Sequence, residues 1–264
     1  MLGKLLKYEW KATARIFVPF YLAIVVFALI NRIFISLNVT GGWMSFVAGL
    51  SGAAYAIAIA ATLALTLFII IQRFYKNLLG DEGYLMFTLP VKTWHNITSK
   101  LLIAVLWQLV SAVVVLGSVF VMVAQKGVFA EIRRAFTEIA AELAKLNISF
   151  GAMLTWLIVM VVVGLFVNIL FVYASISIGQ LFSRHKLVAA FGAFLVLNTV
   201  SQIFSSVLVA ALYFISPQSF VENAVPTNEF IAVFCIGLTC INLLMGAIYY
   251  IVSERILTKC LNLD

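Results

Sequence analysis

The chain has 264 residues, of which 64% are hydrophobic and only 10% are charged. A soluble domain of average composition is about 25% charged, so this composition excludes a soluble globular protein and predicts a membrane protein. Six spans of about 20 residues each would leave too little chain for a separate nucleotide-binding or catalytic domain, and the net charge of +7 indicates membrane topology rather than nucleic-acid binding.

The first fifteen residues form a basic, amphipathic segment. If residues 1–15 are helical, four basic side chains fall on one face and an apolar stripe falls on the opposite face. No small-residue cleavage site follows, which argues against a signal peptide. The pattern predicts an amphipathic helix that lies in the headgroup layer and leads directly into the first span. The basic residues are Lys4, Lys7, Lys11 and Arg15, and the opposite face carries Leu2, Leu5, Leu6, Trp10 and Thr13.

Six continuous apolar runs are long enough to be membrane-spanning helices, each of which needs about 20 residues. Strands of a β-barrel would instead show short segments of alternating polarity. The predicted fold class is therefore all-α: a polytopic membrane protein with a single transmembrane domain over residues 1–264. The predicted spans cover residues 16–37, 47–71, 101–124, 150–181, 187–215 and 230–252, with a short turn containing paired glycines at residues 38–43.

Neutral polar side chains recur at helical spacing in the second and fifth spans. Small and hydroxylated residues let helices approach closely and hydrogen-bond to each other, so helix packing is one interpretation. The other interpretation is that these two spans face a cargo path or a twofold contact between two copies of the chain. The residues are Ser51, Tyr55, Thr62 and Thr66 in the second span, and Asn198, Gln202 and Ser205 in the fifth.

Residues 72–100 form a long connector whose apolar side chains are not needed to cross a membrane. Exposed apolar residues bordered by charge are typical of a binding surface, and the alternative is a segment that folds back against the bundle. Asp81 and Glu82 would favour the start of a short helix, and Pro90 would end it. Thr93 is the predicted N-cap of the helix that enters the third span.

Residues 125–147 are too polar to span a membrane, but their apolar residues recur every three or four positions. This pattern predicts an external amphipathic helix, which acts either as a plain connector or in gating or cargo contact. The basic residues give the orientation, because twelve of the seventeen Lys and Arg residues fall on one side of the predicted membrane. Basic residues collect on the cytoplasmic side, so both termini are predicted to be cytoplasmic.

The sequence contains no recognisable catalytic centre. It lacks the phosphate-binding loop of ATPases and the common hydrolase and metalloprotease motifs. Its three cysteines predict neither a disulfide framework nor a zinc site. We therefore expect no enzymatic activity, no metal site and no cofactor held by this chain itself. The central parts of the spans contain no Asp or Glu, which disfavours a channel or a secondary carrier.

The layout of the chain resembles the permease subunit of a bacterial type 2 ABC exporter. The basic segment MLGKLLKYEWKATAR resembles the connecting, or elbow, helix of that family, and the segment GDEGYLMFTLPVKTWHNITSKLL resembles its first cytoplasmic coupling helix. The six spans extend this resemblance over the whole chain. The sequence departs from the family in lacking its frequent Arg-rich run and its Gly-Thr-Leu form at the coupling site.

The resemblance implies a half-transporter in the plasma membrane. Two permeases, identical or paralogous, would pair among the membrane lipids, and each would contact a separate ABC ATPase subunit that binds ATP and Mg²⁺. An amphipathic or hydrophobic cargo, such as a peptide or a lipid, would pass between them. The rival interpretation is a non-transporting immunity or signalling protein that binds a cytosolic partner through residues 72–100. The implied ATPase-coupling residues are Asp81, Glu82, Gly83, Tyr84, Leu85, Phe87, Leu89 and Pro90.

Overall fold

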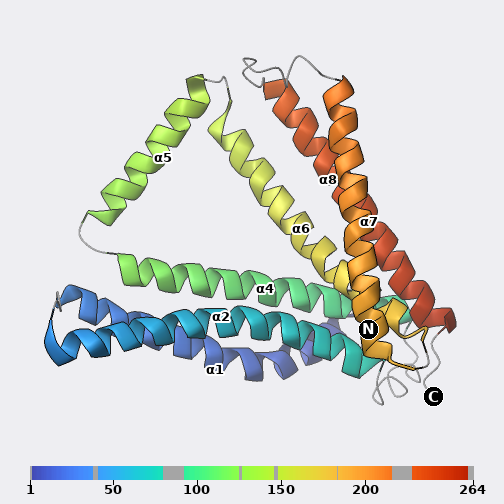
Figure 1. Ribbon diagram of the computed structural model, residues 1–264, viewed down its shortest axis with the longest axis horizontal. Coiled ribbons are helices and arrows are strands. Elements are labelled where there is room, and N and C mark those ends of the chain that lie inside the picture. The colour runs from blue at the N-terminus through green and yellow to red at the C-terminus, as the bar shows by residue number, and fades with distance from the viewer. Residues whose placement is uncertain are drawn as a thin grey trace. The chain divides into compact units, whose positions relative to one another are not determined.

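The computed structural model describes residues 2–37, 41–79, 92–124, 127–145, 148–182, 184–215 and 228–260. These residues form helices and no strand, which confirms the all-α prediction. In chain order the helices are α1 (Leu2–Ser36), α2 (Gly42–Leu78), α4 (Thr93–Val123), α5 (Val128–Lys145), α6 (Phe150–Gly179), α7 (Lys186–Ile215) and α8 (Asn228–Arg255), followed by the short π-helical segment η2 (Ile256–Cys260) (Figure 1).

Six of these helices are long and apolar enough to cross a membrane, namely all except α5. Each of the six predicted spans corresponds to one of them. The helices α1 and α2, with 35 and 37 residues, are each longer than 50 Å at about 1.5 Å per residue. The hydrocarbon core of a bilayer is about 30 Å thick, so both helices extend beyond it. The residues of the predicted N-terminal amphipathic helix are the first turns of α1, continuous with its apolar part.

The backbone conformation of a single residue sets the start of α4 and the start of α2. The prediction that Thr93 caps α4 is wrong, because Thr93 is already helical and Lys92 occupies the N-cap with an extended backbone. The side chain of Lys92 makes no capping hydrogen bond. The second of the paired glycines, Gly42, begins α2 with a φ of +71°. This left-handed conformation is open to glycine at little cost, which explains the glycine in the turn.

The chain forms two compact units. The first unit contains α1, α2 and α4, and α1 packs along α4. Its core includes Phe17 and Tyr21 from α1, Ile69 from α2, and Ile103 and Trp107 from α4. The buried residues of α1 recur every three or four positions, as expected for one face of a helix. This buried face comprises Glu9, Thr13, Phe17, Tyr21, Ile24, Ala28 and Asn31.

The second unit contains α6, α7, α8, η2 and most of α5, and α6 packs against both α7 and α8. Small residues let these helices approach closely. A Cβ atom placed on Gly179 would lie 2.5 Å from the Cβ of Ala190 in α7, and one on Gly246 of α8 would lie 3.1 Å from Val167 of α6. Close helix–helix contacts of this kind are typical of membrane proteins, where burial of apolar side chains gives little driving force.

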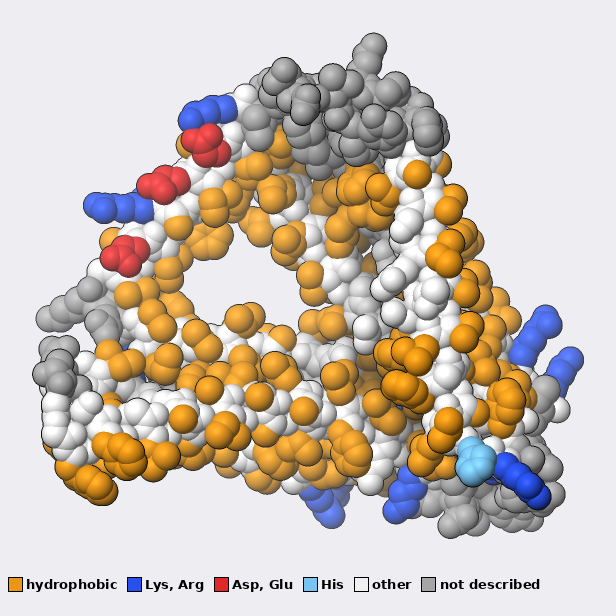
Figure 2. Space-filling view, in the orientation of Figure 1, with side chains coloured by type: hydrophobic (Ala, Val, Ile, Leu, Met, Phe, Trp, Pro, Cys, Tyr) orange, Lys and Arg blue, Asp and Glu red, His pale blue; other side chains and the backbone are white. Residues whose placement is uncertain are grey.

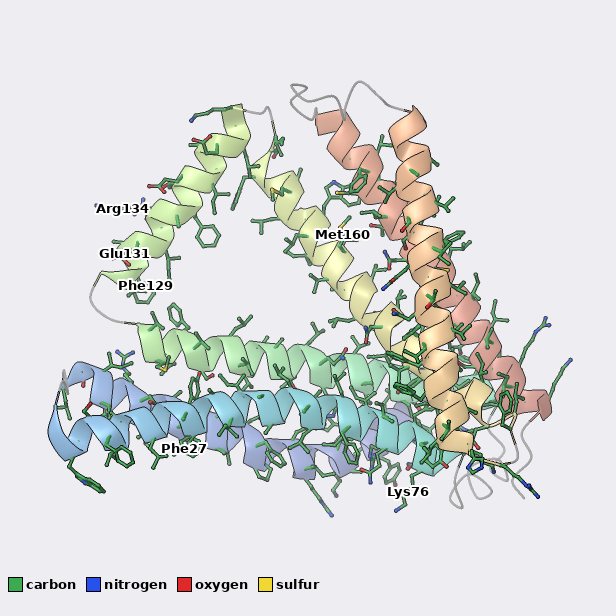
Figure 3. The ribbon with its side chains drawn as sticks, in the orientation of Figure 1. Phe27, Lys76, Phe129, Glu131, Arg134 and Met160 are labelled. Carbon is green, nitrogen blue, oxygen red and sulfur yellow. The ribbon has the colours of Figure 1, made fainter. Side chains whose placement is uncertain are left out.

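The helix α5 matches the predicted amphipathic helix at residues 125–147. It begins after Gly127, whose φ is +106°, and none of its residues is buried. Its charged side chains line one edge and hydrophobic side chains line the other (Figure 2). Glu131 and Arg134 lie on the charged edge, while Phe129 projects from the apolar side (Figure 3). An amphipathic helix of this composition suits the boundary between water and an apolar phase.

Candidate functional site

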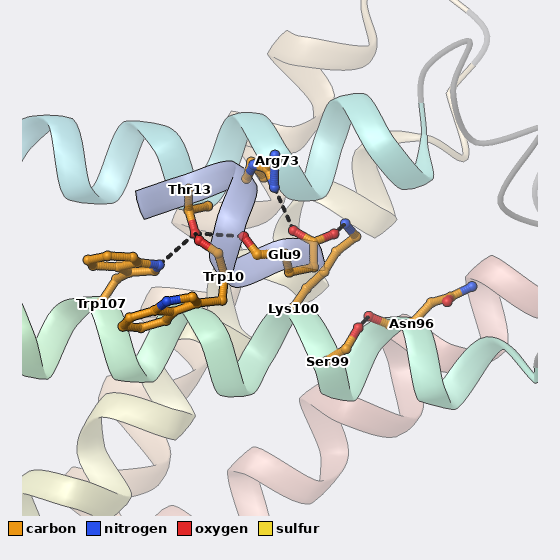
Figure 4. Close-up of polar contacts among 8 residues, drawn as sticks. All are labelled: Glu9, Trp10, Thr13, Arg73, Asn96, Ser99, Lys100 and Trp107. Carbon is orange, nitrogen blue, oxygen red and sulfur yellow. Dashed lines mark hydrogen bonds and ion pairs between the residues drawn. The ribbon is translucent and has the colours of Figure 1, made fainter. Parts of the chain in front are cut away.

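An ion cluster joins the three helices of the first unit. The carboxylate of Glu9 in α1 accepts a hydrogen bond from Arg73 Nη1 in α2 and another from Lys100 Nζ in α4, each at 2.6 Å (Figure 4). The side chain of Lys100 is 3% exposed, that of Glu9 9% and that of Arg73 25%. We call these residues the Glu9 cluster. Charges so poorly solvated are stable only when they are paired and hydrogen-bonded, so each helix depends on the other two at this point.

Aromatic side chains hold the first turns of α1 in register beside the cluster. Trp107 Nε1 in α4 donates to Thr13 Oγ1 at 2.7 Å, and Thr13 Oγ1 donates to the carbonyl oxygen of Glu9 at 2.7 Å (Figure 4). The Trp10 ring stacks on the Trp107 ring with centroids 4.5 Å apart, and the Phe17 ring lies 4.6 Å from Trp107. These contacts fix the rotation of α1 against α4, which aims the Glu9 carboxylate at Arg73 and Lys100.

The cluster lies at the helix ends that flank residues 80–91. Arg73 stands in the last turns of α2, and Lys100 stands two turns after the start of α4. One turn before Lys100, the buried Asn96 side chain makes no hydrogen bond to a described residue, while its carbonyl oxygen accepts one from Ser99 Oγ at 2.9 Å. Among the described residues, no group of His, Cys, Asp and Glu is placed to hold a metal ion. The arrangement therefore provides an electrostatic link between the three helices.

In the sequence, the predicted coupling residues lie between Arg73 and Lys100, two members of the Glu9 cluster. They lie in the connector between α2 and α4, and all eight fall outside the described residues. Their predicted role therefore stays a prediction. The eight are Asp81, Glu82, Gly83, Tyr84, Leu85, Phe87, Leu89 and Pro90.

Three of the polar residues predicted in the second span lie in the interior of the first unit. Tyr55 Oη is 2.8 Å from Ser118 Oγ of α4, and Thr66 Oγ1 is 3.0 Å from Ser111 Oγ of α4. Thr62 is buried and donates to a carbonyl oxygen of its own helix. The bonds of Tyr55 and Thr66 to α4 fit the helix-packing interpretation, while the cargo-path or twofold-contact interpretation stays a prediction.

The remaining members of the predicted path are less buried. Ser51 is half-buried, and its carbonyl oxygen accepts a hydrogen bond from Asn31 Nδ2 at 3.2 Å, whereas its hydroxyl has no partner among the described residues. Asn198, Gln202 and Ser205 are exposed on α7, in the second unit. The residues that share this sequence pattern therefore lie in two different environments. Those of α2 are mostly hydrogen-bonded inside the first unit, whereas those of α7 form an exposed polar face.

Ser111→Ala is expected to lower the free energy of unfolding by about 1–2 kcal/mol. The reason is that Ser111 Oγ forms two hydrogen bonds, one with Thr66 Oγ1 at 3.0 Å and one with Tyr21 Oη at 2.7 Å. Ser51→Ala is the matched control and should change stability by less than about 0.5 kcal/mol, since no hydrogen bond to a described residue is lost. Thermal unfolding of both purified variants in the same detergent measures the difference. Equal melting temperatures would contradict the packing role of Ser111.

The most consequential residue that the sequence analysis overlooked is Glu9. A signal for it was present, because Glu9 is the only acidic residue among the first fifteen and precedes Thr13 by one helical turn. An acidic residue on the apolar side of a basic amphipathic helix requires a cationic partner. The identity of that partner, and the fact that there are two, followed only from the packing of α2 and α4 against α1.

Comparisons with known proteins identify no relative of this chain. No family model, no curated protein and no solved structure matches this chain. The observations available for a functional conclusion are the six apolar helices, the joint formed by the Glu9 cluster and the composition of the connector that follows α2.

Proposed function

We propose that this chain is the transmembrane permease subunit of an ATP-driven exporter that moves an amphipathic or hydrophobic cargo. A separate ABC ATPase subunit supplies the energy, because the sequence has no phosphate-binding loop of its own. ATP and Mg²⁺ bind to that subunit. In this arrangement the chain is a multi-pass protein of the plasma membrane with both termini in the cytoplasm, where its Lys and Arg residues are most numerous.

The Glu9 cluster is the observation that carries this proposal. An ATPase that pushes on a short connector can move a transmembrane bundle only if the push reaches several helices together. Residues 81–90 follow α2 and precede α4, and the cluster ties the adjoining parts of these helices to each other and to α1. A displacement of the connector would therefore move three helices as one body, which is the mechanical requirement for coupling.

The cargo would pass between two paired permeases, formed by a second copy or by a paralogue. The exposed polar face of α7, with Asn198, Gln202 and Ser205, suits this contact better than α2 does, because Tyr55, Thr62 and Thr66 already have hydrogen-bond partners within their own unit. Both sets consist of neutral side chains, which favours an uncharged or amphipathic cargo over a small ion.

The double substitution Leu85→Glu and Phe87→Glu is expected to abolish association with the ATPase while the membrane protein stays folded. Two carboxylates in an apolar docking segment would have to be desolvated without a partner on binding. The measurement is co-purification from native membranes in mild detergent, with ATP hydrolysis of the purified complex as the second readout. Unchanged recovery of an active ATPase with this variant would refute the coupling role of residues 81–90.

A matched control places the same charges elsewhere on the predicted cytoplasmic side. Phe182 and Leu187 are exposed and lie around the connection between α6 and α7, so Phe182→Glu with Leu187→Glu should retain the ATPase. The rival function makes a different prediction. If the chain is an immunity or signalling protein, residues 72–100 retain a cytosolic partner, but the purified complex hydrolyses no ATP.

A further inference from the structure

The first turns of α1 carry a row of four basic side chains, which we call the basic stripe. They follow one another at steps of three and four residues, so all four lie within an arc of about 80° on one face of the helix. All four are exposed, and none forms an ion pair or a hydrogen bond with a described residue. The stripe therefore presents four positive charges to the surroundings of the chain. Its residues are Lys4, Lys7, Lys11 and Arg15.

The opposite face of these turns is largely occupied by contacts within the first unit. An amphipathic helix that lies on a membrane buries its apolar face there. In α1, however, Trp10 of that face stacks on Trp107 of α4 (Figure 4). Thr13 is buried, and Leu6 packs against the core of the first unit. The basic stripe is therefore the face of these turns that remains for contact with lipid, and an attachment through it is electrostatic rather than hydrophobic.

No acidic residue compensates the charge of the stripe within these turns. Glu9 is the single acidic residue among the first fifteen, and it belongs to the buried face of α1. Its carboxylate already accepts hydrogen bonds from Arg73 and Lys100, each at 2.6 Å. The helix α5 provides a contrast, because its sequence contains three basic and three acidic residues. An uncompensated row of cations attracts an anionic partner, whereas a helix without net charge has no such preference.

The face of α1 that carries the stripe becomes apolar directly after it. Four exposed apolar side chains continue the line of the stripe toward the middle of the helix, where lipid hydrocarbon is the matching environment. The stripe therefore lies where the hydrocarbon ends and the head groups begin. Tyr8 and Trp10 are exposed in the same turns, and these residue types are enriched at this level of membrane proteins. The four apolar residues are Val18, Leu22, Val25 and Leu29.

Distances along α1 indicate which cations of the stripe reach the head groups. The head-group layer is about 5–8 Å thick on each side of the hydrocarbon core. Along the helix axis, Arg15 lies about 4.5 Å from Val18 and Lys11 lies about 10 Å from it. Their long side chains can therefore place their charges among the lipid phosphates. Lys4, about 21 Å from Val18, acts on the lipids mainly through its field, which salt screens over about 8 Å.

We infer that the basic stripe binds the phosphate groups of anionic phospholipids, with Lys11 and Arg15 in direct contact. A zwitterionic head group balances its phosphate with a cation of its own, so the stripe prefers a lipid with net negative charge, such as phosphatidylglycerol. A soluble acidic partner fits this surface less well, because the same face continues into exposed apolar residues. The binding requires neither an ATPase nor a cargo, so the inference stands apart from the proposed function.

The experiment measures lipid binding to the complete purified chain in a mild nonionic detergent by native mass spectrometry. Phosphatidylglycerol and phosphatidylcholine with identical acyl chains are added separately and in competition. The unaltered chain is expected to bind phosphatidylglycerol about 25-fold more tightly, because each of two cations near the lipid phosphates contributes a factor of about five. This preference should decrease as the concentration of ammonium acetate is raised, since salt screens the attraction.

Removing the two contacting charges provides the matched test. Lys11→Gln with Arg15→Gln is expected to lower the preference for phosphatidylglycerol to less than about fivefold, since the remaining cations lie beyond the head groups. Lys11→Arg with Arg15→Lys keeps both charges and should retain the preference. Arg133→Gln with Arg134→Gln removes two charges from α5, where acidic residues stand nearby, and should also retain it. Thermal unfolding in the same detergent checks the fold of each variant, and the lipid competition in the unaltered chain needs none of them.

Several results would overturn the inference. Equal affinities of the unaltered chain for the two lipids would contradict the preference for anionic head groups. A folded Lys11→Gln and Arg15→Gln variant with full preference, or an equal loss in the α5 variant, would exclude the basic stripe as the site. Displacement of phosphatidylglycerol by an equal concentration of soluble glycerol phosphate would identify a site for free phosphate instead of lipid. A chain that keeps its lipid preference but recruits no ATPase would keep this inference and lose the proposed function.

Discussion

Replacing Glu9 by Gln is expected to lower the free energy of unfolding by about 3–5 kcal/mol, the usual cost of removing one member of a buried ion pair. The Gln side chain has nearly the same shape, so the packing around Trp10 and Thr13 can persist. What it lacks is the negative charge that Arg73 and Lys100 approach to 2.6 Å from two different helices. Two cations would then lie close together without the shared carboxylate, in an environment where water can solvate Lys100 only poorly.

Thermal or denaturant unfolding of purified chains in one detergent measures this effect. Glu142→Gln is the control, because it removes the same charge from a pair whose two side chains are about two-thirds exposed, and exposed pairs contribute only about 0–1 kcal/mol. The expected order of stability is therefore unaltered chain, then Glu142→Gln close to it, then Glu9→Gln far below. A Glu9→Gln chain as stable as the control would show that the Glu9 cluster does not hold α1, α2 and α4 together.

Gly179→Ala is expected to destabilise the second unit by about 1–3 kcal/mol, the typical cost of overpacking a tight contact. The added Cβ would stand 2.5 Å from the Cβ of Ala190 and 2.6 Å from its Cα and backbone nitrogen. A flexible side chain could turn away from such an overlap, but the backbone of α7 cannot. The two helices would have to separate at the point where residues 180–185 connect them.

The matched control for this substitution is Gly164→Ala on the same helix. No atom lies within 4 Å of a Cβ built on Gly164, and alanine favours a helix over glycine by about 1 kcal/mol. Gly164→Ala should therefore leave the melting temperature unchanged or raise it, while Gly179→Ala lowers it. Equal effects of the two substitutions would mean that the contact between α6 and α7 tolerates a larger separation than its geometry indicates.

The elements of the fold could be predicted from the sequence with little error. A run of about 20 apolar residues without charge has one stable solution in a bilayer, because every backbone polar group must find its partner within the helix. The six long apolar helices and the amphipathic helix α5 depended only on this local rule and on periodicity. The position of the α4 cap was predicted one residue too late, since the backbone at Lys92 and not the capping preference of Thr93 sets the start of the helix.

The candidate site could be predicted only in part. The polar residues of α2 were visible as a pattern, but periodicity is the same for a packing face and for a cargo path. The structure adds that Thr66 and Tyr55 have hydrogen-bond partners on α4, Ser111 and Ser118, as a packing face requires. These partners lie between 45 and 63 residues away in the chain, a separation at which no local pattern indicates contact.

The sequence alone determined that this is an all-α membrane protein and which of its segments are apolar enough to span the bilayer. Composition and periodicity suffice for these conclusions because transfer of a helix into a bilayer is a property of that helix. Only the tertiary structure decided that Glu9, Arg73 and Lys100 share one site, that Gly179 meets Ala190, and that residues of α5, α6 and α8 line one apolar pocket. Each of these features depends on the distance between residues of different helices, which arises only when the helices pack.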